Sequence, residues 1–205
     1  ELFTKEFNDI LNDDEVSVVA EVMGGLHPAY EFTKSLLEAG KSVVTSNKEL
    51  VATYGTELLE IARGKNVNYF FEASVGGGIP IITPMIENLI ANQITEIRGI
   101  MNGTSNYILT KMKEDKLDFE EALHLAAEMG YAEADPSYDV DGIDAGHKIA
   151  ILSSLAYGGY INFSEVYLQG IRDISLVDIF EAEKLGFSIK LIASSKINED
   201  KLVEI

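Results

Sequence analysis

The sequence predicts an α/β fold in two parts, and three observations support this prediction. Between residues 16 and 75, three short β-branched or aromatic runs alternate with two amphipathic segments. After Pro80 this alternation stops, and helical patterns surround a strand-like stretch. Neither part contains an apolar run near the roughly 20 residues of a membrane-spanning helix. We therefore expect a parallel βαβαβ unit over residues 1–80 and an α+β domain with a mixed sheet over residues 81–205.

Five elements are expected in the first part. β-branched and aromatic runs predict its strands, and apolar residues at spacings of three and four predict its helices. Pro28 favours a first helical turn, and Gly40 favours a helix end. In chain order, the expected elements are a strand at 16–22, a helix at 28–40, a strand at 41–46, a helix at 48–65 and a strand at 67–75.

Two loops of this unit follow its first two strands, at residues 21–28 and 45–50. Open parallel sheets bind ligands beyond the carboxyl ends of their strands, so both loops are candidate ligand sites. Lys48 lies where the second strand has ended and a helix begins. A helix N-terminus disfavours a cation, so Lys48 is a candidate for function as well as for structure.

The second part has a different pattern. Helical periodicity dominates it, and only two stretches alternate in the manner of strands. Gly130 marks the end of one helix. In chain order, the expected elements are a helix at 80–93, a strand at 94–103, helices within 106–130, a helix at 144–159, and a helix followed by a strand over 178–197.

The charge of the chain excludes several partners. The 34 Asp and Glu residues against 16 Lys and Arg give a formal net charge of -18. Such a chain repels phosphate backbones and anionic lipid surfaces, so we expect no nucleic-acid or membrane partner. The chain has no cysteine, which fits a cytoplasmic location. Small molecules and other proteins remain as partners.

Glycine patterns give weaker signals. No G-x-G-x-x-G turn, which cradles a dinucleotide pyrophosphate, occurs near the start of the chain. The run "VGGGIP" at 75–80 follows the last strand of the first part. Backbone carbonyls exposed by such a turn could coordinate a hard cation, and a tight chain reversal is the alternative.

The acidic stretch "GYAEADPSYDVDGIDAGHK" at 130–148 allows three interpretations: a metal site, a site for a cationic substrate, or a solvated loop. A calcium loop with Gly142 at its sixth position would place Asp139 and Asp141 correctly, but Ser137 at position 1 and Lys148 at position 12. Zinc fits poorly too, because the chain has no cysteine and only three histidines, with no two of them at a metal-binding spacing. A metal is therefore disfavoured.

Asp144 and Lys148 are four residues apart on a predicted helix, so their side chains share one face. Together they could bind a charged substrate and transfer a proton. An ordinary surface ion pair at this spacing is the alternative, worth only about 0.3 kcal/mol.

Several motifs in order resemble the homoserine dehydrogenase family. They are "NKELVA", "FEASVGGGIPII", "GIMNGTSNYIL", "GYAEADPSYDVDGIDAGHK" and "KIAIL", and they span nearly the whole chain. The family's N-terminal glycine-rich cofactor turn and its C-terminal segment have no counterpart here. We therefore expect a core fragment, with a partial Rossmann-type nucleotide-binding domain over 1–80 and a substrate-binding, catalytic and dimerisation domain over 81–205.

The resemblance implies interconversion of homoserine and aspartate 4-semialdehyde in threonine, methionine and isoleucine biosynthesis. It implies NAD or NADP as cofactor, a homodimer, and a sodium ion. The alternatives are another NAD(P)-dependent amino-acid oxidoreductase and a non-catalytic acidic dimerisation module. The implied roles are Lys148 as general acid/base, with Lys48 at the same site; Gly130, Glu133, Asp144, Asp139 and Thr104 at the substrate; Met23, Gly24 and Lys48 at the cofactor; and Glu72, Val75, Gly77 and Ile79 at sodium.

Overall fold

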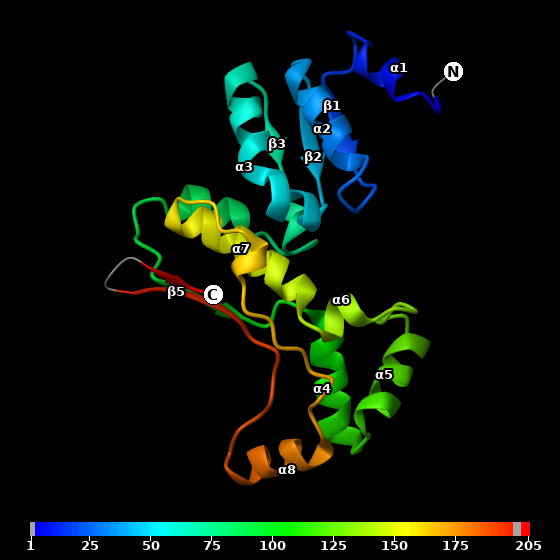
Figure 1. Cartoon of the computed structure of the whole chain (residues 1–205), viewed down its shortest axis with the longest axis vertical. Coiled ribbons are helices and arrows are strands. Elements are labelled where there is room, and N and C mark those ends of the chain that lie inside the picture. The colour runs from blue at the N-terminus through cyan, green and yellow to red at the C-terminus, as the bar shows by residue number, and fades with distance from the viewer. Residues whose placement is uncertain (1–2, 199–201) are drawn as a thin grey trace. The chain divides into compact units, whose positions relative to one another are not determined.

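The computed structural model describes residues 3–198 and 202–205, and it confirms the predicted α/β class (Figure 1). The chain forms two compact units. The first runs to Gln93 and also includes Ser154–Phe163, so it extends past the predicted boundary at residue 80. The second contains Ile94–Ser153 and Ser164–Ile205. In the described ranges, no helix is long and apolar enough to cross a membrane.

The first unit contains the predicted βαβαβ arrangement. Its three strands pair in parallel in the order β1-β2-β3, with Val19 opposite Val43 and Val43 opposite Tyr69. The α-helices and strands of this unit are α1 (Phe7–Leu11), β1 (Val18–Glu21), α2 (Ala29–Glu38), β2 (Ser42–Thr45), α3 (Lys48–Lys65) and β3 (Tyr69–Phe70).

The two faces of this sheet differ in burial. Val43 of β2 is fully buried, as are Leu37 of α2 and Leu50 and Leu58 of α3. Val44, the next residue of β2, points to the other face and is 41% exposed. This alternation follows from the period of two in a strand. The core of the first unit therefore lies on the face of the sheet that carries the buried side of β2.

Three details of the first unit differ from the prediction. Helix α1 was not expected; its Phe7 ring stacks on Phe32 with centroids 3.9 Å apart. Strand β3 ends at Phe70, because the chain turns at once into a short 3-10 helix, η1 (Glu72–Ser74). The predicted helix at 80–93 is reduced to a short π-helix, η2 (Pro84–Asn88).

The second unit is helical with one small sheet. The strands β4, β5 and β6 pair antiparallel in that order, so only the antiparallel part of the expected mixed sheet is seen among the described strands. The remaining elements of the chain are β4 (Glu96–Gly99), α4 (Gly103–Asp115), α5 (Phe119–Glu128), α6 (Ser137–Val140), α7 (Ile143–Tyr157), η3 (Phe163–Glu165), α8 (Leu176–Lys184), β5 (Ala193–Ile197) and β6 (Val203–Glu204).

The main core of this unit is formed by several of its helices. Ile108 and Met112 of α4 are fully buried against Ala122 of α5, Val140 of α6 and Ile179 of α8. Figure 1 shows α4 and α5 side by side. This packing holds the N-terminus of α4 near α6, and the site described below uses that proximity.

The start of α4 departs from the prediction. The expected strand at 94–103 ends at Gly99, and Asn102 is the N-cap of α4. Its backbone is extended, with φ -128° and ψ 123°, and its side chain accepts a hydrogen bond from Ser105 N. Asn is among the best N-caps for this reason. Residues 100–102 therefore form a short connection from the sheet to α4.

Candidate functional site

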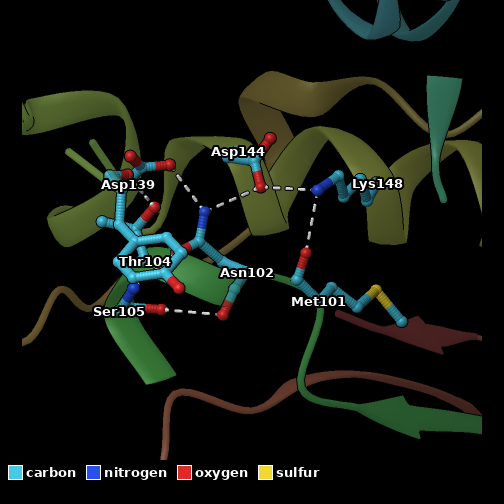
Figure 2. A network of polar contacts seen from close by, with 8 residues as sticks. Met101, Asn102, Thr104, Ser105, Asp139, Asp144 and Lys148 are labelled. Carbon is cyan, nitrogen blue, oxygen red and sulfur yellow. Dashed lines mark hydrogen bonds and ion pairs between the residues drawn. The ribbon is translucent and has the colours of Figure 1, made fainter. Parts of the chain in front are cut away.

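The predicted pair on α7 lies within a network of polar contacts (Figure 2). Lys148 Nζ donates to Asp144 Oδ2 at 2.8 Å and to the Met101 carbonyl oxygen at 2.9 Å. The side chain of Lys148 is 17% exposed and that of Asp144 is 4% exposed. An exposed i,i+4 pair has no such burial and no third partner, so the ordinary surface ion pair is the weaker interpretation.

Asn102 is a member of this network that the sequence did not indicate. Its Nδ2 donates to Asp139 Oδ1 at 2.6 Å and to Asp144 Oδ2 at 2.9 Å. It is only 5% exposed. Asn102 lies in the motif "GIMNGTSNYIL" but inside the expected strand at 94–103, and even an N-cap pattern at this position would predict nothing about distant carboxylates.

The loop between α5 and α6 carries two further predicted residues. Gly130 adopts φ +75°, a left-handed conformation that ends α5 and that residues other than glycine rarely adopt. Thr104 Oγ1 donates to the carbonyl oxygen of Tyr131 at 2.8 Å, which ties this loop to the start of α4. Glu133 lies farther along the loop and is exposed. Its carboxylate is accessible, unlike that of Asp144.

Other carboxylates of the acidic stretch have local structural partners. Arg172 Nε and Nη2 donate to Asp141 at 2.5 and 3.2 Å, and the same guanidinium donates to Ser137 Oγ at 2.9 Å. The hydrogen bonds from Ser137 lower the pKa of Asp135. The stretch is therefore divided: Asp139 and Asp144 join the Lys148 network, while Asp135 and Asp141 stabilise the loop.

In the first unit, a buried glutamate ties together the loops that follow β1 and β2. Glu21 Oε1 accepts from Met23 N at 2.7 Å, and Glu21 Oε2 accepts from Thr45 Oγ1 at 2.5 Å. Asn47 Nδ2 donates to the Gly25 carbonyl oxygen at 2.6 Å. Burial, and then the charge of Glu21, raise the pKa of Tyr69.

These loops fit the edge of a nucleotide site. They lie at the carboxyl ends of parallel strands, where such sites occur in open sheets. Gly24 adopts φ +78°, and a Cβ built on it would meet nothing within 4 Å, so a ligand could approach its backbone closely. Met23 is 50% exposed beside it, and Lys48 begins α3. Met23, Gly24 and Lys48 therefore gather at one edge of the first unit, whereas Lys148 belongs to the second.

The turn predicted to hold sodium also lies in the first unit. The Glu72 carboxylate accepts four hydrogen bonds, from Ile81 N, Ile82 N, Thr83 N and Thr83 Oγ1, at 2.6 to 2.7 Å. Burial alone would raise the pKa of Glu72, but these bonds together lower it to about 2. Its carboxylate is thus already used, and a cation at Glu72, Val75, Gly77 and Ile79 would need the main-chain carbonyls. Across the described residues, no three His, Asp or Glu side chains form a metal-binding cluster.

Comparisons with known proteins agree with this arrangement. Residues 80–204 match the family model described as homoserine dehydrogenase, and residues 1–72 match that of the homoserine dehydrogenase NAD-binding domain. A homoserine dehydrogenase from Synechocystis sp. is 48% identical over 193 residues, which cover 94% of this chain and 45% of the relative. One from Neisseria gonorrhoeae is 47% identical, and the match covers 95% of this chain and 45% of that relative. The chain spans about half the length of these relatives.

Solved structures show the same likeness. A crystal structure of a homoserine dehydrogenase from Thiobacillus denitrificans has a TM-score of 0.93 at 45% identity. The match covers 96% of this chain and 46% of the chain in that structure. A hyperthermophilic archaeal homoserine dehydrogenase in complex with NADPH has a TM-score of 0.82 at 33% identity. The match covers 96% of this chain and 57% of that structure's chain. The similarity therefore extends across both units.

Proposed function

Because the chain belongs to the homoserine dehydrogenase family, we propose that its protein interconverts L-homoserine and L-aspartate 4-semialdehyde with NAD or NADP. The observation that carries this proposal is the buried Asp144–Lys148 pair, which contacts Met101 and Asn102 inside the segment matched by the family model. The reaction belongs to the biosynthesis of threonine, methionine and isoleucine. A related enzyme in complex with NADPH supports a nicotinamide cofactor.

Lys148 is the proposed proton-transfer group. When the aldehyde is reduced, its carbonyl oxygen gains negative charge and must receive a proton, which the Lys148 ammonium can donate. In the reverse direction, the same amine takes the proton of the homoserine hydroxyl. The nicotinamide, when bound, carries the hydride. Ion pairing with Asp144 at 2.8 Å holds the amine in one orientation, so its proton is aimed at one place.

Asp144 and Glu133 would have different roles. Oδ2 of Asp144 already accepts from Asn102 and Lys148, and the residue is 3% exposed, so we assign it to orienting Lys148. The exposed Glu133 carboxylate is better suited to bind the ammonium of the amino-acid substrate. Three further residues would shape the substrate-binding site: Gly130 in the α5–α6 loop, Thr104 at the start of α4, and Asp139 in α6.

At the first unit, Met23, Gly24 and Lys48 would border the nicotinamide. A role for Lys48 in the same reaction is part of this proposal, as the family resemblance implies. A sodium ion would bind carbonyl oxygens of Glu72, Val75, Gly77 and Ile79. Replacing sodium chloride by choline chloride should then lower the melting temperature, because an ion that binds only the folded state stabilises it. An unchanged melting temperature would remove the ion from the proposal.

The whole protein is further proposed to be a cytoplasmic homodimer that associates through the second unit. The cysteine-free, acidic sequence is compatible with this location. The assembly is tested separately below, because it does not depend on the chemistry at Lys148.

The activity is tested with the full-length gene product. Absorbance at 340 nm reports nicotinamide reduction when L-homoserine is supplied with NAD⁺ or NADP⁺. A panel of serine, threonine, aspartate and glutamate is the matched control, because another amino-acid oxidoreductase would prefer one of these. Homoserine should give the highest kcat/KM. Turnover of a panel member at equal or higher kcat/KM, or no turnover of homoserine, would reject the assignment.

A further inference from the structure

Asn102 occupies a position where one side chain meets three different groups. Its Oδ1 accepts from Ser105 N at 2.8 Å, which caps α4. Its Nδ2 faces Asp139 Oδ1 and Asp144 Oδ2 at 2.6 and 2.9 Å. Met101, the preceding residue, accepts from Lys148 through its carbonyl oxygen at 2.9 Å. Two consecutive residues therefore contact both members of the Asp144–Lys148 pair.

The chemistry fixes the orientation of this amide. An Asn NH₂ group has two hydrogens, and each can serve one carboxylate. If the amide were reversed, its oxygen would face two carboxylates and its nitrogen would face the Ser105 N–H, so all three contacts would be repulsive. The observed orientation satisfies all of them.

Capping alone does not require Asn at this position. Ser and Asp are about as good as Asn at an N-cap, because each presents an oxygen to the backbone N–H groups. Only Asn combines that acceptor with two donors. Without the donors, the buried Asp144 and the partly buried Asp139 would face each other with fewer hydrogen bonds and with like charge.

We propose that Asn102 is a positioning residue for the dehydrogenase reaction: it joins Asp139 of α6 to Asp144 of α7 through one nitrogen and so holds Asp144 in the orientation that fixes Lys148. This inference rests on the proposed function of Lys148. Asn102 itself is not assigned any contact with substrate or cofactor. Its effect passes through the carboxylate whose Oδ2 it shares with Lys148.

Two variants separate positioning from capping. Asn102→Asp is isosteric and Asn102→Ser is smaller, and both keep the capping oxygen while losing the amide donors. We expect kcat to fall by about tenfold or more in each, as one lost charge-assisted hydrogen bond would allow. The Asp variant should be the slower, because it adds a third carboxylate beside two others. A cap-only role predicts that both keep at least half of the parent kcat, and that result would overturn the proposal.

A second readout does not depend on dehydrogenase activity. In Asn102→Ser, amine acetylation of Lys148, followed by mass spectrometry, should speed up by about tenfold relative to the parent. Lys190 is the internal reference, because it lies in the same unit and donates to Asn106 Oδ1 and Thr110 Oγ1. An unchanged ratio of Lys148 to Lys190 labelling would overturn the proposal, even if kcat fell, since the loss would not pass through Lys148.

Ser175→Ala is the matched control for a lost N-cap. It removes the cap of α8 in the same unit, so it should lower the melting temperature while leaving kcat and Lys148 labelling unchanged. If the parent protein does not oxidise homoserine, the proposed function fails by itself, and the labelling ratio still decides whether Asn102 holds Lys148.

Discussion

At the scale of single residues, Lys148 carries the chemistry of the proposed reaction. Lys148→Arg keeps a cation beside Asp144, but the pKa of an arginine, above about 12, prevents it from exchanging a proton near neutrality. We expect kcat to fall by at least about a hundredfold, the lower end of one acid/base contribution. Steady-state kinetics in the full-length protein measure this.

Lys190→Arg is the control for that variant, because Lys190 is another partly buried lysine of the second unit, hydrogen-bonded to Asn106. It should keep nearly all of the parent turnover. A Lys148→Arg protein that retains more than half of the parent kcat would exclude Lys148 as the proton-transfer group.

Local spacing explains which site residues the sequence could predict. Asp144 and Lys148 are one helical turn apart, so a helix prediction alone brings them together, and the structure shows them in contact. Asn102 is 42 positions from Asp144 in the sequence, and only the packing of α4 near α6 and α7 makes that contact. Periodicity carries no information about such pairs.

At the scale of elements, the connection between η3 and α8 contains Gly170, whose backbone lies very close to the end of α6. A Cβ on Gly170 would lie 2.5 Å from the Val140 carbonyl oxygen and 2.8 Å from Asp141 Cα. Ile171 N also donates to Val140 O at 2.8 Å. Gly170→Ala should therefore displace the end of α6 and reduce the free energy of unfolding by about 1–3 kcal/mol, the usual cost of overpacking.

Urea denaturation of the full-length protein tests this expectation. Gly64→Ala is the control, because Gly64 lies in α3 and a Cβ there meets nothing within 4 Å. That change should leave stability equal or slightly higher, since Ala is the better helix former. Equal stability of the Gly170→Ala protein and the parent would contradict the predicted clash.

Glu72 stabilises the chain segment that leads into η2, and this contribution depends on pH. Its pKa is lowered from 4.5 to about 2 in the folded protein. The stabilisation is therefore fully present above about pH 4.5 and is lost as the pH falls toward 2. Glu72→Gln should cost about 1–2 kcal/mol at pH 7, because the neutral amide replaces one acceptor oxygen by a donor.

Denaturation at pH 7 and pH 3 measures this dependence. The difference in free energy of unfolding between the parent and Glu72→Gln should narrow at the lower pH, because at pH 3 the carboxyl group of the unfolded chain takes up a proton while the folded carboxylate, with its pKa of about 2, is still mostly ionised. A difference that stays constant or grows on acidification would show that the four hydrogen bonds do not carry the effect.

The elements themselves were largely predictable where sequence signals are local. Strands β1 and β2 and helices α2 and α3 lie within the predicted ranges, because β-branched runs, proline and glycine act within a few residues. The prediction was wrong for 80–93 as a continuous helix. There, the N–H groups of Ile81 to Thr83 bind Glu72, nine to eleven residues earlier, and no helical period reveals such a partner.

At the scale of the whole molecule, net charge opposes the proposed dimer. These 205 residues carry a formal charge of -18, so the corresponding parts of two copies repel each other at long range. The sheet of the second unit nevertheless presents both signs on its exposed positions, with Glu96 and Arg98 on β4 and Lys196 on β5. Association through this sheet would need local complementarity to exceed the global repulsion.

Salt should therefore strengthen the dimer. Repulsion between the two net charges acts over many ångströms and is largely screened once the Debye length falls to about 8 Å, near 0.15 M salt. Short-range packing at an interface is screened much less. We expect sedimentation velocity of the full-length protein to show a tighter dimer at about 0.15 M than at about 0.01 M sodium chloride.

Potassium chloride is the control for a specific sodium effect. A monomer at micromolar concentration in both salts would reject the dimer, and a dimer weakened by salt would show that attraction between opposite charges, rather than packing, holds the two chains together.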